Sequence, residues 1–354
     1  MVRYFSKVVK YIKDYRQKRI FNALAINYYK KHKHKHFEFT ENIWSRNILW
    51  DYFLQSLPHS IRSEYFVPGD YYACELEPKL NSKFMEFGEE KNLYEKIFSC
   101  SLIRFPYTIL RCVDSVFFDG RYALVGDVYD YCKSIREDII VKPTVHAGSG
   151  EGIRKYFYCD GVLIFDGNKQ FDLEEITKKC KGNFTIQRIV DQHPEIASFH
   201  PDSLNTVRAF SYRSFVTETV HVPTVVLRMG VNHSYLDTVS YGAIACGITG
   251  SGKLMRYAFD LYGNCFLSHP TTDMRFEDFT VPAFDKIIRA IKQLANFIPH
   301  QRVAGWDFGV DKHNMPVLIE VNVTTGSWLM QIATGRPLFG KHSQEVKNYV
   351  DSLM

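Results

Sequence analysis

The 354-residue sequence predicts an α+β protein with a mostly helical N-terminal extension. Three observations lead to this prediction. Short segments of strand character, several joined into hairpins by polar turns, recur between residues 105 and 322. Among those segments, an amphipathic helix is expected at 89–100, with Leu93 and Ile97 inward and Tyr94 as a further candidate. A second is expected at 284–297, with an inward face of Ile287, Ile288, Ile291, Leu294, Ala295 and Ile298. Apolar residues also recur at helical spacing before residue 30. At 45% hydrophobic residues, this length allows one large domain with lobes or two domains.

The N-terminal segment 1–36 holds most of the positive charge. It carries eleven Lys and Arg residues and one acid, Asp14, so its net charge is +10, whereas the remaining chain is at −5. A basic amphipathic helix can lie on an anionic membrane surface. Three interpretations stay open for this segment. It can make peripheral contact with the inner leaflet of the membrane, dock on an acidic partner, or form a solvated helix packed on the body of the protein.

Composition argues against several classes of protein. No apolar run approaches the ~18–20 residues of a membrane span. The N-terminus has no clean hydrophobic region of a secretory signal. The eight cysteines form no CxxC pair, which favours free thiols in a reducing cytoplasm. We therefore expect a cytoplasmic protein, with no nucleic acid among its partners. Residues 37–86 are mixed and aromatic, so we expect short helices and loops there, forming a cap with the N-terminal helix over residues 1–86.

A glycine-rich loop follows a short strand at 138–143. The strand ends with Lys142-Pro143, and the loop includes Gly148-Ser149-Gly150-Glu151-Gly152. Glycines let backbone N–H groups approach phosphates closely, and a lysine can reach a phosphate as a point charge. This is no Walker A loop, since neither the GK[ST] signature nor a helix follows. A plain flexible hairpin loop is the alternative.

The next two strands are expected at 184–190 and within 200–212. A polar turn from Asp191 to Glu195 follows the first of them, and Arg208 lies inside the second among apolar neighbours. Such an arginine is either half-buried against a carboxylate or part of an anion clamp. The amphipathic helix 284–297 then leads to a C-terminal hairpin.

That hairpin is predicted to pair strands 304–310 and 315–321. Residues two apart on a strand share a face, so Glu320 and Asn322 lie together, and Asp307 on the paired strand can join them. Two carboxylates and an amide oxygen suit Mg²⁺. The alternative is a core hairpin with scattered polar residues. A strand that buries one face would, however, seldom carry such groups without a partner.

In order, these segments resemble the ATP-grasp superfamily, and within it the branch associated with sugar transfer and capsule or surface-polysaccharide loci. The resemblance runs from about residue 65 to the C-terminus. It rests on short motifs in the right order: Glu90-Lys91-Asn92-Leu93-Tyr94, Ile140-Val141-Lys142-Pro143, Gly148-Ser149-Gly150-Glu151-Gly152, Ser203-Leu204-Asn205-Thr206-Val207-Arg208, His269-Pro270, Gly305-Trp306-Asp307 and Leu318-Ile319-Glu320-Val321-Asn322. It implies an ATP-grasp fold over residues 87–354, in which two α+β lobes grip ATP. The lid lobe would cover about 110–190 and the large lobe about 191–345.

The resemblance also implies residue roles, with ATP and Mg²⁺ as cofactors. Lys142 would contact the α- and β-phosphates, Lys91 would be a second lysine, and Gly148, Ser149 and Gly150 would cover the phosphates. Gln187 would face adenine N6, and the backbone of Arg188 to Val190 would complete the adenine edge. Either Asp191 or Glu195 would hold the ribose. Arg208 would stabilise the γ-phosphate and an acylphosphate, and the metal ligands would be Asp307, Glu320 and Asn322.

The implied activity is ATP-dependent ligation of a carboxylate to an amine through an acylphosphate, in capsule or O-antigen biosynthesis. The expected substrates are a carboxylate-bearing sugar, such as a uronic acid, and an amino acid or amino sugar. A kinase-like phosphotransferase and a catalytically degenerate nucleotide-binding module stay open as alternatives. Two segments depart from the branch, Val323-Thr324-Thr325-Gly326 and Leu236-Asp237-Thr238, and both are expected near the acceptor substrate.

Overall fold

The computed structural model describes residues 43–44, 54, 57–58, 63–81, 90–144, 150–165, 169–238, 241–323 and 326–353. The predicted helix within 1–36 lies outside the described residues, as do Gly148 and Ser149 of the predicted phosphate loop. Those expectations therefore stay predictions, as does the division of the chain at residue 86.

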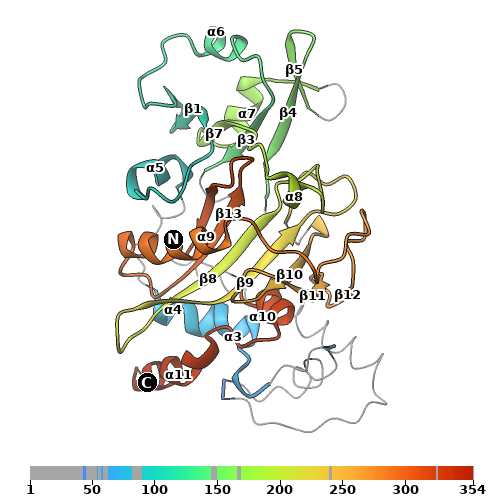
Figure 1. Cartoon of the computed structure of the whole chain (residues 1–354). Helices are drawn as coiled ribbons and strands as arrows, with labels where there is room; N and C mark the ends of the chain where they lie inside the picture. Colours follow the sequence, from blue (N-terminus) through green and yellow to red (C-terminus); the bar gives the residue numbers. More distant parts are fainter. Residues whose placement is uncertain are drawn as a thin grey trace.

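Among the described residues, strands form two seven-stranded antiparallel sheets (Figure 1). The first sheet has the order β2-β1-β7-β3-β4-β5-β6, and α6 (Val128–Lys133) and α7 (Leu173–Lys179) lie in the same part of the molecule. Its strands are β1 (Thr108–Val113), β2 (Val116–Asp119), β3 (Ile139–Pro143), β4 (Arg154–Cys159), β5 (Val162–Phe165), β6 (Lys169–Gln170) and β7 (Phe184–Arg188).

The second sheet has the order β12-β11-β10-β9-β8-β13-β14. Its strands are β8 (Thr206–Arg213), β9 (Val220–Met229), β10 (Ile244–Ile248), β11 (Leu254–Phe259), β12 (Cys265–Phe266), β13 (Val303–Val310) and β14 (Pro316–Asn322). The other helices are α3 (Gly69–Tyr71), α4 (Glu77–Leu80), α5 (Tyr94–Ile97), α8 (Pro194–Ala197), α9 (Phe284–Leu294), α10 (Trp328–Thr334) and α11 (Ser343–Ser352). Short helices of other types are η1 (Ser63–Tyr65), η4 (Lys91–Leu93), η6 (Ala295–Phe297) and η7 (Gly340–His342), all 3-10, and the π-helical η2 (Tyr72–Leu76).

Both faces of the second sheet are buried at the end remote from the first sheet (Figure 1). One face packs against α9, whose Ile287, Ile291 and Leu294 are fully buried, as the predicted amphipathic pattern requires. The other face packs against α10 and the helices from residue 69 to 80, with Phe210 and Val226 in its core. Closer to the first sheet, the latter face carries polar side chains in place of apolar ones, and the candidate site lies there.

Most of the predicted elements that frame the site are confirmed. The α+β class is confirmed, and the C-terminal hairpin consists of β13 and β14, within one residue of the predicted bounds. The predicted helix 89–100 is wrong in length, because within the described residues 90–100 only Lys91–Ile97 is helical. Its Leu93 is exposed and its Tyr94 is buried, since the Tyr94 hydroxyl hydrogen-bonds to the backbone of Val321. None of the described helices is both long and apolar enough to cross a membrane.

Candidate active site

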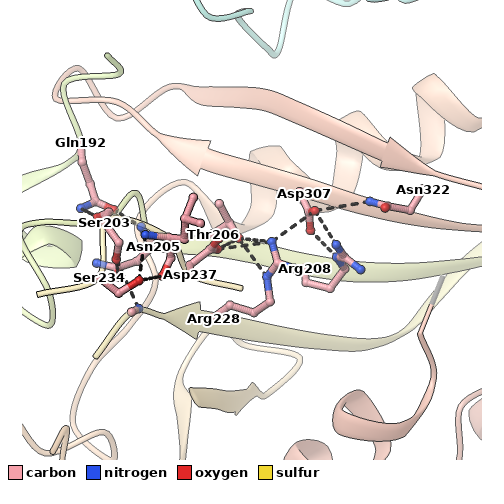
Figure 2. A network of polar contacts seen from close by, with 12 residues as sticks. Gln192, Ser203, Asn205, Thr206, Arg208, Arg228, Ser234, Asp237, Asp307 and Asn322 are labelled. Atoms are coloured by element: carbon pink, nitrogen blue, oxygen red, sulfur yellow. Dashed lines mark hydrogen bonds and ion pairs between the residues drawn. The ribbon is translucent and has the colours of Figure 1, made fainter. Parts of the chain in front are cut away.

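The centre of the site is Asp307, which is 1% exposed (Figure 2). Arg208 lies directly opposite it on β8, and its Nε and Nη2 atoms both donate to the carboxylate, Nη2 at 2.5 Å. The Nη2 of Arg228 lies 3.2 Å from the same carboxylate, and Asn322 donates to it at 3.4 Å. Burial would raise the pKa of Asp307, but the charges of Arg208 and Arg228 outweigh burial and lower it. The carboxyl is therefore ionised at neutral pH.

Arg228, for which the sequence predicts no role, holds a second, partly buried carboxylate beside the first. Its Nε and Nη2 donate to the Thr206 hydroxyl at 3.1 and 2.8 Å, and Nη2 lies 3.3 Å from Asp237. Thr206 in turn donates to Asp237, whose pKa burial raises against the opposing charge of Arg228. The signal in the sequence was weak, since an arginine near the end of an apolar strand becomes informative only once the neighbouring strand is known.

Lys91 and Lys142 approach the site from outside the second sheet. Lys91 pairs with Glu320 on β14 at 2.8 Å. Lys142, on β3 of the first sheet, is 8% exposed. Burial, and next the charge of Lys91, lowers the pKa of Lys142 to about 8, while Glu320 opposes this shift. Two lysines that lie far apart in the sequence are thus brought close to one carboxylate.

The three predicted metal ligands lie on neighbouring strands. Asp307 and Glu320 are paired in the β13–β14 register, so they share a face, and Asn322 contacts Asp307 directly. Their oxygen atoms have the chemistry that Mg²⁺ prefers. In this structure the guanidinium groups of Arg208 and Arg228 neutralise Asp307, and the Lys91 amine neutralises Glu320. A divalent cation bound at these carboxylates would neutralise them in the same way. Among the described residues, no group of three or more His, Cys, Asp and Glu side chains is arranged to hold a metal ion.

Of the predicted adenine residues, Gln187 and Arg188 lie at the end of β7 of the first sheet, and Val190 follows that strand. Gln187 is 8% exposed, and its Nε2 donates to the Thr108 hydroxyl at 3.3 Å. The Arg188 side chain pairs with Glu137, and the Arg188 N–H donates to the carbonyl of Tyr107 at 2.9 Å. That N–H is therefore already used, and within 188–190 the adenine edge would have to use other backbone groups, such as those of Val190.

The two ribose candidates differ in their surroundings. Asp191 is exposed and pairs with Lys312 at 2.7 Å, and its carbonyl accepts from the Lys312 N–H. Glu195 is exposed at the start of α8, and none of the described residues forms a hydrogen bond or ion pair with its carboxylate. No described contact joins either residue to the Asp307 cluster.

The end of the glycine loop contacts a loop of the second sheet. Gly150 has a φ of +77°, and a Cβ there would lie 3.1 Å from the Thr238 hydroxyl and 3.3 Å from Leu236. The Tyr235 hydroxyl donates to the carbonyl of Ile153 at 3.0 Å. Residues 235–238 therefore hold the base of the glycine loop close to the face that carries Asp237.

A family model described as sugar-transfer associated ATP-grasp matches residues 71–348. No relative of curated function matches the sequence.

Similar solved structures include VanG D-Ala:D-Ser ligase from Enterococcus faecalis, at 12% identity and a TM-score of 0.41, covering 75% of this chain and 61% of that chain. They also include the ADP complex of purK, an N5-carboxyaminoimidazole ribonucleotide synthetase, at 15% identity and a TM-score of 0.40, covering 73% and 50%. A third is D-alanine–D-alanine ligase from Bacillus anthracis complexed with ATP, at 12% identity and a TM-score of 0.38, covering 75% and 68%. The matched region thus spans less than two thirds of the first two chains.

Proposed function

This chain belongs to the sugar-transfer associated ATP-grasp family, and we propose that it is an ATP-dependent carboxylate–amine ligase. The observation that carries the proposal is the convergence of cationic and acidic side chains from both sheets. Lys142 comes from the first sheet, Arg208 and Arg228 come from the second, and Lys91 comes from η4. They surround carboxylates that suit a divalent cation. Such a cluster is what binding and neutralising a triphosphate requires.

Each residue has a role that follows from its position. Lys142 and Lys91 bind the phosphates of ATP, together with the backbone N–H groups of Gly148, Ser149 and Gly150. Asp307, Glu320 and Asn322 would hold Mg²⁺, which when bound would offset the charge of the phosphates. Arg208, which pairs with Asp307 in this structure, would stabilise the transferred phosphoryl group. Gln187 and the backbone of Arg188 to Val190 orient adenine, and Asp191 or Glu195 binds ribose.

The proposed chemistry has two steps. A substrate carboxylate oxygen attacks the γ-phosphorus, so that a carboxylate–phosphorus bond forms, the bond to the β-phosphate oxygen breaks and ADP leaves. An amine nitrogen then attacks the acyl carbon, phosphate leaves, and the nitrogen loses a proton to give the amide. No side-chain nucleophile is needed, because both reactants are held in place while cations stabilise the charge.

The biological setting proposed is surface-polysaccharide biosynthesis, such as that of capsule or O-antigen. The family description, sugar-transfer associated, supports a carboxylate-bearing sugar as the acyl donor and an amino acid or amino sugar as the acceptor. We place the enzyme in the cytoplasm, with residues 1–36 in peripheral contact with the inner leaflet. The charge of +10 in that segment supports this placement.

A matrix assay of ADP release tests the proposed function. The purified chain is supplied with Mg·ATP and with pairs drawn from uronic acids, sugar nucleotides, amino acids and amino sugars. ADP release that requires both a carboxylate and an amine supports a ligase. Release with a hydroxyl acceptor alone contradicts it in favour of a kinase-like phosphotransferase. Nucleotide binding without release by any pair favours a degenerate nucleotide-binding module.

A further inference from the structure

Arg111, on β1 of the first sheet, is a buried cation without a role in the proposed chemistry. It is 1% exposed. Its Nη1 donates to the carbonyl of Asn92 at 3.2 Å, its Nη2 lies 2.9 Å from Glu95, and its guanidinium lies 4.2 Å from the centre of the Tyr122 ring. The Tyr122 hydroxyl donates to the same Asn92 carbonyl at 2.6 Å. Burying a charge is unfavourable unless it is paired, so these contacts define one conformation.

The segment that Arg111 holds is η4 and the start of α5. This segment reaches the second sheet through two other residues. Lys91 pairs with Glu320, and the Tyr94 hydroxyl both accepts from the N–H and donates to the carbonyl of Val321. Residues 91–95 therefore join β1 of the first sheet to β14 of the second. Lys91 directly precedes Asn92, whose carbonyl accepts from Arg111. The Lys91 side chain enters the candidate site, where it pairs with Glu320.

Further contacts lead from Arg111 to Gln187, the residue predicted to face adenine. Glu95, the ion-pair partner of Arg111, accepts from the Thr108 hydroxyl at 3.4 Å. Thr108 in turn accepts from Gln187 at 3.3 Å. Arg111 is thus connected to Lys91, at the proposed phosphate end of the nucleotide site, and to Gln187, at the proposed adenine end.

We propose that Arg111 is a positioning residue that fixes η4 to the first sheet, so that the Lys91 amine is aimed at the phosphates. The proposal rests on the proposed function, because it assigns Lys91 to ATP. A lysine whose backbone is already fixed loses less conformational entropy on binding than one on a mobile segment. Arg111 acts through Lys91 and touches no reacting atom.

A purely structural role for Arg111 predicts a different result from a positioning role, and a double-mutant cycle separates the two. The ligand is Mg·AMPPNP, and its Kd for the full chain is measured by titration calorimetry. We expect Arg111→Met to raise Kd by about tenfold and Lys91→Ala to do the same or more. In the Arg111→Met/Lys91→Ala chain we expect the Kd of Lys91→Ala alone, because Arg111 has no lysine left to position.

Arg154→Met is the matched control, because Arg154 also pairs with a glutamate, Glu175 at 3.2 Å, and lies over an aromatic ring of the first sheet, yet no described contact joins it to η4. It should leave Kd unchanged, even where it lowers Tm. Should Arg111→Met not fold, Tyr122→Phe keeps the ring and removes one hydrogen bond to Asn92, for which we expect about a fivefold rise in Kd.

The outcomes separate this inference from the proposed function. Wild-type affinity in both Arg111→Met and Tyr122→Phe overturns it, as do effects of Arg111→Met and Lys91→Ala that multiply in the double variant. Unchanged affinity in Lys91→Ala together with a loss in Lys142→Ala overturns the role of Arg111 and leaves nucleotide binding standing. No binding of Mg·AMPPNP by the wild-type chain overturns the proposed function itself.

Discussion

Replacing Lys142 with methionine should stabilise the empty protein while it weakens nucleotide binding. The lysine is 8% exposed, and burial together with the charge of Lys91 lowers its pKa from 10.5 to about 8. A shift of this size corresponds to about 3 kcal/mol by which the folded state disfavours the charged amine. Methionine keeps most of the side-chain volume without the charge. For a protein of this size we expect Tm at pH 7 to rise by roughly 5 °C.

The gain in Tm from Lys142→Met should become smaller as the pH rises. Below pH 8 the Lys142 amine is charged in both the folded and the unfolded chain, so the full destabilisation is present. As pH rises from about 8 to 10.5, the folded chain loses the proton first, and wild-type stability increases. The Tm advantage of Lys142→Met should therefore be complete at pH 7 and almost absent near pH 10.5. Differential scanning calorimetry across this range measures it.

The same variant should raise the Kd for Mg·AMPPNP at pH 7 by tenfold or more, because a charge on the phosphates is lost. Lys155→Met on β4 is the control, since that lysine lies over the Phe157 ring at the sheet surface and should change neither quantity greatly. A lower Tm for Lys142→Met at pH 7, or wild-type nucleotide affinity, would refute the reasoning.

Three further predictions concern the metal site, the glycine loop and the N-terminal segment. Glu320→Gln should abolish ADP release at ordinary Mg²⁺ while the circular dichroism spectrum stays native, and wild-type turnover would remove Glu320 from the metal site. Gly150→Ala should lower nucleotide affinity severalfold in a calorimetric titration, because φ is +77° and a Cβ lies 3.1 Å from Thr238; unchanged affinity would argue against a role for the loop. The full chain should co-sediment with anionic vesicles at low salt and not at high salt, whereas a chain starting at Phe37 should not bind; equal behaviour of the two chains would exclude residues 1–36 as a membrane contact.

Local patterns predicted much of the framework because their causes are local. The alternation in the C-terminal hairpin places Glu320 and Asn322 on one face, and the structure shows both strands within a residue of their predicted ends. The 3.6-residue period likewise identified the buried face of α9. The same period misled at 89–100, where Leu93 was expected inside. A short helix is oriented by its contacts, and the hydrogen bonds of Tyr94 to Val321 outweigh the periodicity of two turns.

Sequence patterns were enough to predict the fold class, the strand that carries Lys142, and the shared face of Glu320 and Asn322. They could not predict which side chains meet at Asp307, because that depends on how the strands pair. Arg208 faces it because β8 pairs with β13, and Arg228 joins them because β9 lies on the other side of β8. Strand order depends on contacts between residues that are far apart in the chain, and no local periodicity encodes them. For the same reason the sequence does not distinguish Arg111 from other arginines in strands. Its burial and its contact with Asn92, the neighbour of Lys91, follow from the tertiary structure.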